Sequence, residues 1–315
     1  MNDKKLITIL IPCYNEQESL PHLYEALCQL MKEHDNYDWE LLFVNDGSKD
    51  NTLGVLEYLY QLDHRVAYID LSRNFGKENA MLAGFDMAHG DAMVIMDADL
   101  QHPPQTVTEM LKYWEEGYDD VYAKRRDRNY ESWPKRKISN LFYYMLDKST
   151  RYDVLRNVGD FRLLDRKCIN ALKKMRETER YTKGLFCWIG FRKKEILFDV
   201  AERQYGTSSW SIGGLIHLAI EGMTSFTTAP LRIGVIIGLI VAFLALGYMV
   251  WVLIAALLWG DPVAGYPTIM TVMLFLGAVQ LICIGILGEY IGKIFNETKN
   301  RPPYIIRESK EMREK

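Results

Sequence analysis

The chain has 315 residues, of which 49% are hydrophobic, and its formal net charge at pH 7 is −3. This length allows one large or two modest domains, and this hydrophobic fraction excludes a chain that is mainly disordered. The small net charge gives no reason to expect a nucleic acid partner. Five scattered cysteines without a CxxC pair predict neither a disulfide framework nor a zinc site.

Short apolar runs alternate with amphipathic segments through the first part of the chain. Strands are predicted at Leu6–Pro12, Glu40–Asn45, Val66–Asp70, Ala92–Asp97 and Asp119–Ala123. Helices are predicted around Glu18–Lys32, Thr52–Leu62, Glu78–Ala88 and Pro104–Glu116. This rhythm predicts an α/β domain with a mainly parallel sheet, which we place at residues 1–210. The first apolar run is too short for a secretory signal, so the domain is expected in the cytosol.

Two long runs without a charged residue follow, at Ile233–Trp259 and Val263–Gly288. Each is longer than the roughly 20 residues that cross about 30 Å of hydrocarbon, so they predict two transmembrane helices within residues 231–293. Arg232 precedes the first run and Lys293 follows the second, which places both ends of this multi-pass protein, including residues 294–315, in the cytosol. Two buried core helices are the alternative, but they would be much longer than ordinary globular helices.

An amphipathic segment, Ile212–Phe226, connects these two parts and gathers its apolar residues close to one face. The pattern predicts a helix lying in the membrane interface at residues 211–230, and it fits a helix packed on a protein core equally well. The GxxxG spacing, which lets helices approach closely, occurs twice and is compatible with a homo-oligomer. Its members are Gly234 with Gly238 and Gly288 with Gly292.

Polar segments directly follow four of the predicted strands. In an open parallel sheet, ligands bind beyond the carboxyl ends of the strands, so these segments are where a functional site is expected. They are PCYNE (Pro12–Glu16), NDGSKDNT (Asn45–Thr52), LSRNFGKENA (Leu71–Ala80) and DADLQH (Asp97–His102).

The fourth segment pairs two carboxylates, Asp97 and Asp99, directly after an apolar run. Two bare carboxylates this close repel each other, so a divalent cation between them would explain the pair. Hard oxygen ligands suit Mg²⁺ or Mn²⁺, which complete their shells with water and substrate phosphates. Surface turns and helix caps also contain such aspartates, so the pair alone does not establish a metal site.

The four motifs, together with three later ones, closely resemble the polyprenyl-phosphate glycosyltransferases of glycosyltransferase family 2. The later motifs are DFRLLDR (Asp160–Arg166), RQYGTSSW (Arg203–Trp210) and GEYIGKIFNETKNRPPYII (Gly288–Ile306). The last is typical of the branch that contains bactoprenol-phosphate glucosyltransferases and enzymes like dolichol-phosphate mannose synthase. The resemblance covers essentially the whole chain. It implies a GT-A fold, which is a Rossmann-like sheet that binds a nucleotide sugar and a metal.

The resemblance also implies roles for individual residues. The nucleotide would be bound by Pro12, Tyr14, Asn15, Glu16, Asp46, Lys77, Asp97, Ala98 and Asp99. The metal would be bound by Asp97, Asp99 and Gln101. The catalytic residues would be Asp97 and Asp99, Arg125 and Arg136 near the acceptor phosphate, and Arg203 near the donor diphosphate. Family members often carry Lys or Arg where this chain has Ser209, which leaves a second cation on the diphosphate open.

The reaction implied is inverting transfer of a sugar from a nucleotide sugar to polyprenyl (undecaprenyl) phosphate at the cytosolic face of the bacterial inner (plasma) membrane. The donor would be UDP-linked, of the glucose or N-acetylhexosamine type. A phosphate monoester, with a second pKa of about 6, is already ionised at neutral pH, so no histidine base is expected. We interpret His102, which precedes two prolines, as structural.

Three other functions can be compared with the sequence. A processive polysaccharide synthase shares the strand-end loops, but it should carry a QxxRW motif and more membrane spans, and the chain has no RW pair. A nicotinamide dehydrogenase needs GxGxxG after its first strand, where this chain has PCYNE. A membrane-anchored binding protein could retain an inactive GT-A domain, although the intact Asp46, Asp97, Asp99 and Gln101 argue against it.

Overall fold

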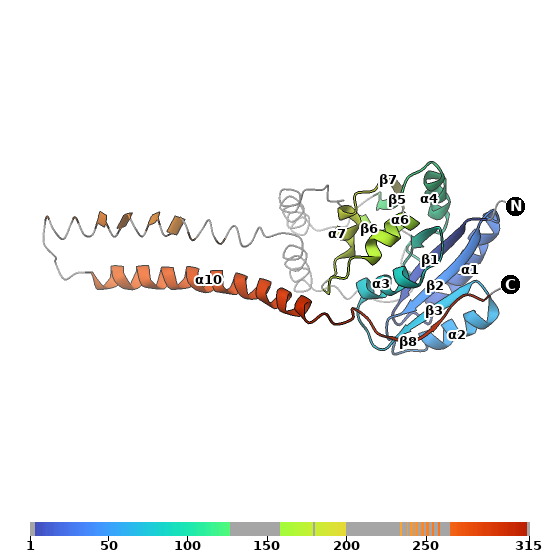
Figure 1. Cartoon of the computed structure of the whole chain (residues 1–315), viewed down its shortest axis with the longest axis horizontal. Helices are drawn as coiled ribbons and strands as arrows, with labels where there is room; N and C mark the ends of the chain where they lie inside the picture. Colours follow the sequence, from blue (N-terminus) through green and yellow to red (C-terminus); the bar gives the residue numbers. More distant parts are fainter. Residues whose placement is uncertain are drawn as a thin grey trace. The chain divides into compact units, whose positions relative to one another are not determined.

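A computed structural model describes residues 4–126, 158–178, 180–199 and 265–313, and isolated helical positions between 234 and 258 (Figure 1). The chain divides into two compact units. The first comprises Met1–Asp147, Arg151–Ser211 and Arg301–Lys315, and the second comprises Lys148–Thr150 and Ile212–Asn300. The end of the chain thus returns to the first unit after the second one is complete.

Among the described residues of the first unit, eight strands form one sheet in the order β7-β5-β6-β4-β1-β2-β3-β8. They are β1 (Leu6–Cys13), β2 (Asp38–Asn45), β3 (Val66–Leu71), β4 (Ala92–Ile95), β5 (Asp120–Arg125), β6 (Val158–Asp165), β7 (Lys193–Phe198) and β8 (Ile306–Lys310). Strands β3, β2, β1 and β4 are parallel to one another. Strand β6 runs antiparallel to β4 and β5, and β8 runs antiparallel to β3, so the sheet is mixed.

Helices cover both faces of this sheet. They are α1 (Ser19–Glu33), α2 (Thr52–Leu62), α3 (Lys77–Met87), α4 (Gln105–Glu115), α6 (Arg166–Lys173) and α7 (Thr182–Trp188). In β1, Ile7, Ile9 and Ile11 are buried in one cluster with leucines of α1. Leu10 points to the other face, where a Cβ on Gly84 of α3 would overlap its side chain. Because both faces are covered, the central strands are continuous apolar runs.

The predicted α/β repeat is confirmed, and its first four helices begin and end within one residue of the predicted bounds. Strands β6, β7 and β8 were not predicted, and the sheet is less parallel than predicted because β6 and β8 run antiparallel to their neighbours. Strand β6 carries Arg162, a charged residue that is only 1% exposed, in its apolar core. Its guanidinium is 3.1 Å from the buried Asp120 carboxylate and lies 3.7 Å from the centre of the Phe186 ring. Arg162 therefore interrupts the apolar pattern by which a strand is predicted from the sequence, although its charge is paired with Asp120 in the folded protein.

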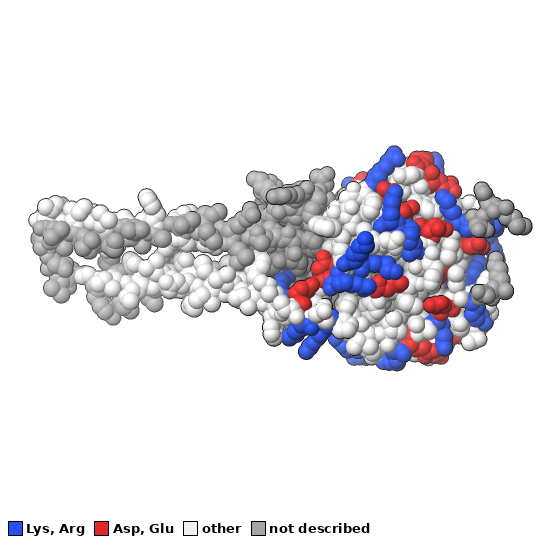
Figure 2. All heavy atoms as spheres, in the orientation of Figure 1, with Lys and Arg blue, Asp and Glu red and all other residues white. Residues whose placement is uncertain are grey.

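The second unit contains α10 (Tyr266–Thr298), a helix of 33 residues. Its segment Phe275–Thr298 has a mean hydropathy of 1.7, and none of it is buried. Within the part of the chain that the structure describes, this is the one helix long and apolar enough to cross a membrane. In Figure 2 its surface is mostly uncharged, whereas the first unit displays many charged side chains. The helix continues ten residues beyond the predicted apolar run, through Glu289 and Lys293.

The first predicted membrane span is described only at isolated positions, all of which are helical. One of them, Gly234, lies close to α10, since a Cβ built on it would be 3.9 Å from both Cys283 and Ile286. The helical position Gly234 therefore lies against α10. The predicted pair of transmembrane helices is not established by one candidate helix. The predicted interfacial helix at 211–230 lies outside the described residues.

Candidate functional site

A pocket of about 300 Å³ opens at the carboxyl ends of β1, β2 and β4. All four predicted strand-end segments contribute to it. Its lining consists of Pro12, Cys13, Tyr14, Glu16, Asp46, Asn74, Gly76, Lys77, Asp97, Ala98 and Asp99. Thus every residue predicted to bind the nucleotide lines the pocket, except Asn15. Cys13, Asn74 and Gly76 also line the pocket but were not predicted, because the path of the backbone through the loops, which brings them there, is not visible in the sequence.

Asn15 does not line the pocket but bonds to the loop after β2. Its backbone has a φ of 57°, and its backbone N–H donates to Ser48 Oγ at 2.9 Å. Its side-chain oxygen accepts from the backbone N–H of Lys49 at 2.8 Å. Next to it, the Glu16 N–H donates to Thr52 Oγ1 at 2.8 Å. These bonds join the loop after β1 to the loop after β2, so the two walls of the pocket are held in one arrangement.

Asp46 fixes a third loop. Its carboxylate accepts from the backbone N–H groups of Phe75 at 2.7 Å and Gly76 at 2.9 Å. Burial raises the pKa of Asp46, and these two hydrogen bonds act in the opposite direction. The side chain thus positions the loop before α3, in addition to lining the pocket where a nucleotide contact was predicted.

Gly47 allows the loop after β2 to lie close to the backbone of the loop after β3. Its φ is +62°, and a Cβ would overlap the backbone of Arg73. We expect Gly47→Ala to lower the free energy of unfolding by about 1.5 kcal/mol, because both strain and a backbone clash result. Gly117→Ala is the matched control, since Gly117 also has a positive φ but its Cβ would face open space apart from one arginine nitrogen at 3.7 Å. The free energy of unfolding of the two full-length variants would be measured with a chemical denaturant. An equal loss of stability in both variants would contradict this prediction.

A lysine lies between two carboxylates at the edge of the pocket. Lys77 Nζ is 2.5 Å from Asp97 Oδ1 and 2.8 Å from Asp160 Oδ2. Burial acts to lower the pKa of Lys77, but the two carboxylates outweigh it and raise the pKa. Burial likewise acts to raise the pKa of Asp160, but Lys77, together with the charges of Lys183 and Arg162, outweighs it and lowers the pKa to about 2. Lys77 and Asp160 therefore both remain charged at neutral pH.

Asp160 was not predicted as a site residue. It lies in β6, its side chain is 8% exposed, and its Oδ1 atom has no hydrogen-bond partner among the described residues. The signal available in the sequence was an aspartate at the start of the apolar DFRLL run, but only the antiparallel pairing of β6 with β4 brings it to Asp97.

The turn that carries the two aspartates is held by His102. The Asp97 N–H donates to His102 Nδ1 at 3.1 Å, which requires an unprotonated Nδ1. The imidazole stacks on Phe161 with 4.4 Å between ring centres and is 4% exposed. Burial lowers its pKa, so the ring is neutral. This geometry agrees with the structural interpretation of His102.

The carboxylates fit a metal only in part. Among the described residues, no group of three or more His, Cys, Asp or Glu side chains could hold an ion. Asp97 and Asp99 both face the pocket, and Asp97 already contacts Lys77. Gln101, the third predicted ligand, does not line the pocket, and its N–H donates to Asp99 Oδ1 at 3.1 Å. Such a set suits a hard cation that obtains most of its ligands from water and substrate oxygens.

Of the three arginines predicted as catalytic residues, the structure describes only Arg125. Arg125 is the exposed last residue of β5, and its charge contributes to the low pKa of His102. It does not line the pocket. Arg136 and Arg203 lie outside the described residues, as does Ser209.

Comparison with known proteins identifies the family. The family model described as Glycosyl transferase family 2 matches residues 8–172, and the one described as GtrB C-terminal hairpin matches residues 229–294. The putative glycosyltransferase CsbB of Bacillus subtilis (strain 168) is 45% identical, over 96% of this chain and 92% of its own. The SfII prophage-derived bactoprenol glucosyl transferase of Shigella flexneri is 42% identical, over 96% of this chain and 98% of its own.

Among solved structures, TarS of S. aureus (residues 1–349) is similar with a TM-score of 0.44 and 16% identity, covering 60% of this chain and 57% of its own. The relatives extend over nearly the whole chain at more than 40% identity, which confirms the resemblance found in the motifs. The chain therefore belongs to glycosyl transferase family 2: it is a glycosyltransferase, and its mixed α/β sheet has the GT-A fold.

Proposed function

We propose that this protein transfers glucose from a nucleotide sugar to polyprenyl phosphate in the bacterial inner membrane. The observation that carries the proposal is a strand-end pocket with paired carboxylates in a chain that also has a long apolar helix without buried residues. Relatives at about 40% identity named bactoprenol glucosyl transferase support both the sugar and the lipid.

The donor would occupy the pocket described above. Pro12, Tyr14 and Glu16 would hold the base and ribose, and Asp46 would contact the nucleotide while fixing the loop before α3. The diphosphate would lie against Asp97 and Asp99 together with Mg²⁺ or Mn²⁺. When bound, the cation would neutralise the charge that develops on the departing diphosphate. Lys77 would hold the Asp97 carboxylate in place, because its ammonium also contacts the buried Asp160.

The acceptor would supply its own nucleophile. A phosphate oxygen of the lipid would attack the anomeric carbon as the bond to the nucleoside diphosphate breaks, which inverts the configuration. The cost of bringing an anion to an anionic donor would be offset by arginines, for which Arg125 and Arg136 are the candidates, with Arg203 on the donor diphosphate. No side chain is needed to remove a proton.

His102 provides a test of this last point. The pH–rate profile should rise through about pH 6 as the acceptor phosphate ionises and then stay level. His102→Gln should keep that shape, because an amide oxygen can accept the Asp97 N–H, and should lower the rate by less than about 10-fold through one weakened hydrogen bond. Loss of the rising limb, or the drop of about 1,000-fold typical of removing a general base, would contradict the absence of a histidine base.

The membrane part would bring the pocket to the lipid. An isoprenoid chain stays in hydrocarbon, so its phosphate is accessible only at headgroup depth. We propose that α10 and the predicted apolar span at residues 233–259 form a membrane hairpin, that residues 211–230 lie in the interface, and that the α/β domain is cytosolic. The match of residues 229–294 to a family hairpin supports this arrangement.

A panel of donors tests the proposal. Purified full-length protein would be incubated with undecaprenyl phosphate, Mg²⁺ or Mn²⁺, and UDP-glucose, UDP-N-acetylglucosamine or GDP-mannose. We expect UDP-glucose to give the highest rate. Preference for UDP-N-acetylglucosamine would change the sugar, preference for GDP-mannose would overturn the assignment of the nucleotide, and no transfer from any donor would favour an inactive binding protein.

A further inference from the structure

The last residues of the chain are built into the α/β unit. After α10 ends at Thr298, seven residues that include Pro302 and Pro303 lead to β8, which lies antiparallel to β3 at the edge of the sheet. We call residues 301–313 the tail. Proline restricts this connector to extended conformations. The tail thus follows α10 in the chain and forms part of the sheet that carries the pocket.

One tail residue, Arg307, forms an ion pair with a buried carboxylate. Arg307 Nη1 donates to Asp70 Oδ2 at 3.1 Å, and its Nη2 donates to the carbonyl of Ser72 at 2.8 Å. Asp70 is the penultimate residue of β3 and is 1% exposed, whereas the Arg307 side chain is 58% exposed. The guanidinium therefore caps a buried carboxylate from the surface, which is a charge-assisted hydrogen bond.

Asp70 also connects Arg307 to the pocket loops through hydrogen bonds. Its other oxygen, Oδ1, accepts from the side-chain amide of Asn45 at 2.8 Å. Asn45 precedes Asp46, and its side-chain oxygen accepts from the Ser48 N–H at 3.2 Å. Ser48 Oγ in turn accepts from the Asn15 N–H at 2.9 Å. A continuous set of hydrogen bonds thus runs from the tail to two loops that form the pocket.

A second route reaches the third loop. The Ser72 N–H donates to the carbonyl of Ile305 at 2.9 Å, while its own carbonyl accepts from Arg307. Ser72 begins the loop that contributes Asn74 and Gly76 to the pocket lining. Both backbone groups of the first loop residue are therefore held by the tail.

From these contacts we infer that Arg307 is a positioning residue for the nucleotide: through Asp70 and Ser72 it holds the loops after β2 and β3 in the arrangement that binds the donor. The inference rests on the proposed function, because it presumes a nucleotide in this pocket. It gives the tail a role in donor binding, although the tail contributes no residue to the pocket lining.

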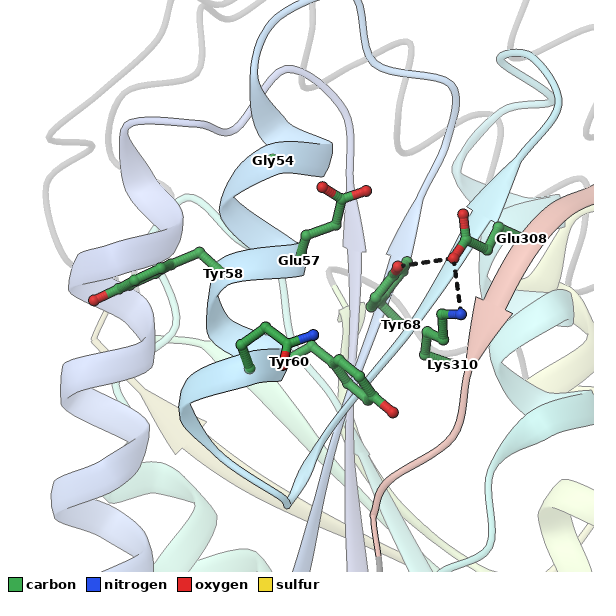
Figure 3. Close-up of a pocket in the computed structure, with 8 residues that line it drawn as sticks. Gly54, Glu57, Tyr58, Tyr60, Tyr68, Glu308 and Lys310 are labelled. Carbon is green, nitrogen blue, oxygen red and sulfur yellow. Dashed lines mark hydrogen bonds and ion pairs between the residues drawn. The ribbon is translucent and has the colours of Figure 1, made fainter.

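Other tail residues bind the tail to the first unit away from the pocket, and one of them provides a control for Arg307. Arg313 donates to the carbonyls of Tyr60 at 2.7 Å and Gln61 at 3.1 Å, at the opposite end of β3. A surface hollow of about 460 Å³ lies between α2 and β8. In Figure 3 the Tyr68 hydroxyl and Lys310 both point to Glu308. The corresponding distances are 3.3 Å and 3.2 Å. None of these side chains lines the nucleotide pocket.

The test compares Arg307→Gln with Arg313→Gln in the full-length protein. Each change removes one tail guanidinium and its two hydrogen bonds to the rest of the first unit. The dissociation constant of UDP would be measured with Mg²⁺ present, alongside the KM for each substrate. Arg307→Gln should raise the UDP dissociation constant and the donor KM by roughly 10-fold and leave the acceptor KM unchanged. Arg307→Lys should restore part of the affinity, and Arg313→Gln should keep it.

Asp70→Asn gives an independent check. If Arg307 acts through Asp70, the double variant should bind UDP about as weakly as the weaker single variant, because contacting residues are not additive. Equal UDP affinity in Arg307→Gln and the unaltered protein, or equal loss in Arg313→Gln, would overturn the inference and leave the proposed function standing. Failure of the unaltered protein to bind any uridine nucleotide would overturn the proposed function and the inference together.

Discussion

Asp99→Ala is expected to lower sugar transfer by about 1,000-fold, the largest effect of any single change considered for this protein. Asp99 lines the pocket beside Asp97, and Asp97 already contacts Lys77. In the proposed function, Asp99 would lie beside the divalent cation and the donor diphosphate. Its removal should leave the folded domain intact, since its side chain is at the pocket surface and not in the apolar core.

Gln101→Ala is the matched comparison for this prediction. Gln101 was predicted from the family resemblance as a third metal ligand, but its side chain does not line the pocket. We expect this variant to keep most of its activity. Initial rates would be measured over a range of Mg²⁺ concentrations. Unchanged turnover by Asp99→Ala, with the divalent ion removed by a chelator, would contradict the role given to the aspartate pair.

Lys77→Met is expected to have the second largest effect, on both stability and donor binding. The change leaves two carboxylates facing each other without a cation, and one of them, Asp160, is 8% exposed. Removing one partner from a buried pair costs about 3–5 kcal/mol, and we expect about 3 kcal/mol because the Lys77 side chain is 41% exposed and solvent weakens its interactions. Donor affinity should fall with it, since Asp97 loses its support.

The effect of Lys77→Met should depend on pH. In the unaltered protein the pKa of Asp160 falls from 3.8 to about 2 on folding, so its contribution to stability is present above about pH 4 and is lost as pH falls toward about 2. Without Lys77, the pKa of Asp160 loses the largest of the effects that lower it, so protonation begins at a higher pH and relieves the variant. The difference in unfolding free energy should thus be largest near neutral pH and shrink on acidification. Lys183→Met, which removes a charge without direct contact to Asp160, is the control.

Chemical denaturation of the three full-length proteins at a series of pH values would measure this. A stability gap between Lys77→Met and the unaltered protein that stays constant from neutral to acidic pH would contradict the cluster as described. An equal loss in Lys183→Met would show that the effect is general electrostatics and not the contact itself.

Much of the pocket could be predicted because local pattern and topology agree there. Each parallel strand is a continuous apolar run, so its end is visible in the sequence, and the rule that ligands bind at strand ends brings PCYNE, NDGSKDNT and DADLQH together. Asn15 shows the limit of this reasoning. It was predicted to bind the nucleotide, but its side chain bonds to Lys49 and holds a loop.

The residues that were missed depend on long-range pairing. Asp160 meets Lys77 and Asp97 only because β6 inserts antiparallel between β4 and β5, and no local pattern announces that. Arg162 in the same strand made it look polar, although its charge is paired with Asp120 inside the core. The tail was predicted only as a cytosolic extension, since a five-residue edge strand with four exposed positions has no apolar pattern to detect.

The most direct test of the proposed function is to ask which lipid accepts the sugar. Full-length protein in vesicles would be supplied with Mg²⁺ and labelled UDP-glucose, and with either undecaprenyl phosphate or the unphosphorylated alcohol, undecaprenol. We predict label in the lipid fraction only with the phosphate and only with the divalent ion, in a product heavier than the acceptor by one hexose. Transfer to undecaprenol, or release of free glucose without a lipid product, would contradict attack by the lipid's own phosphate.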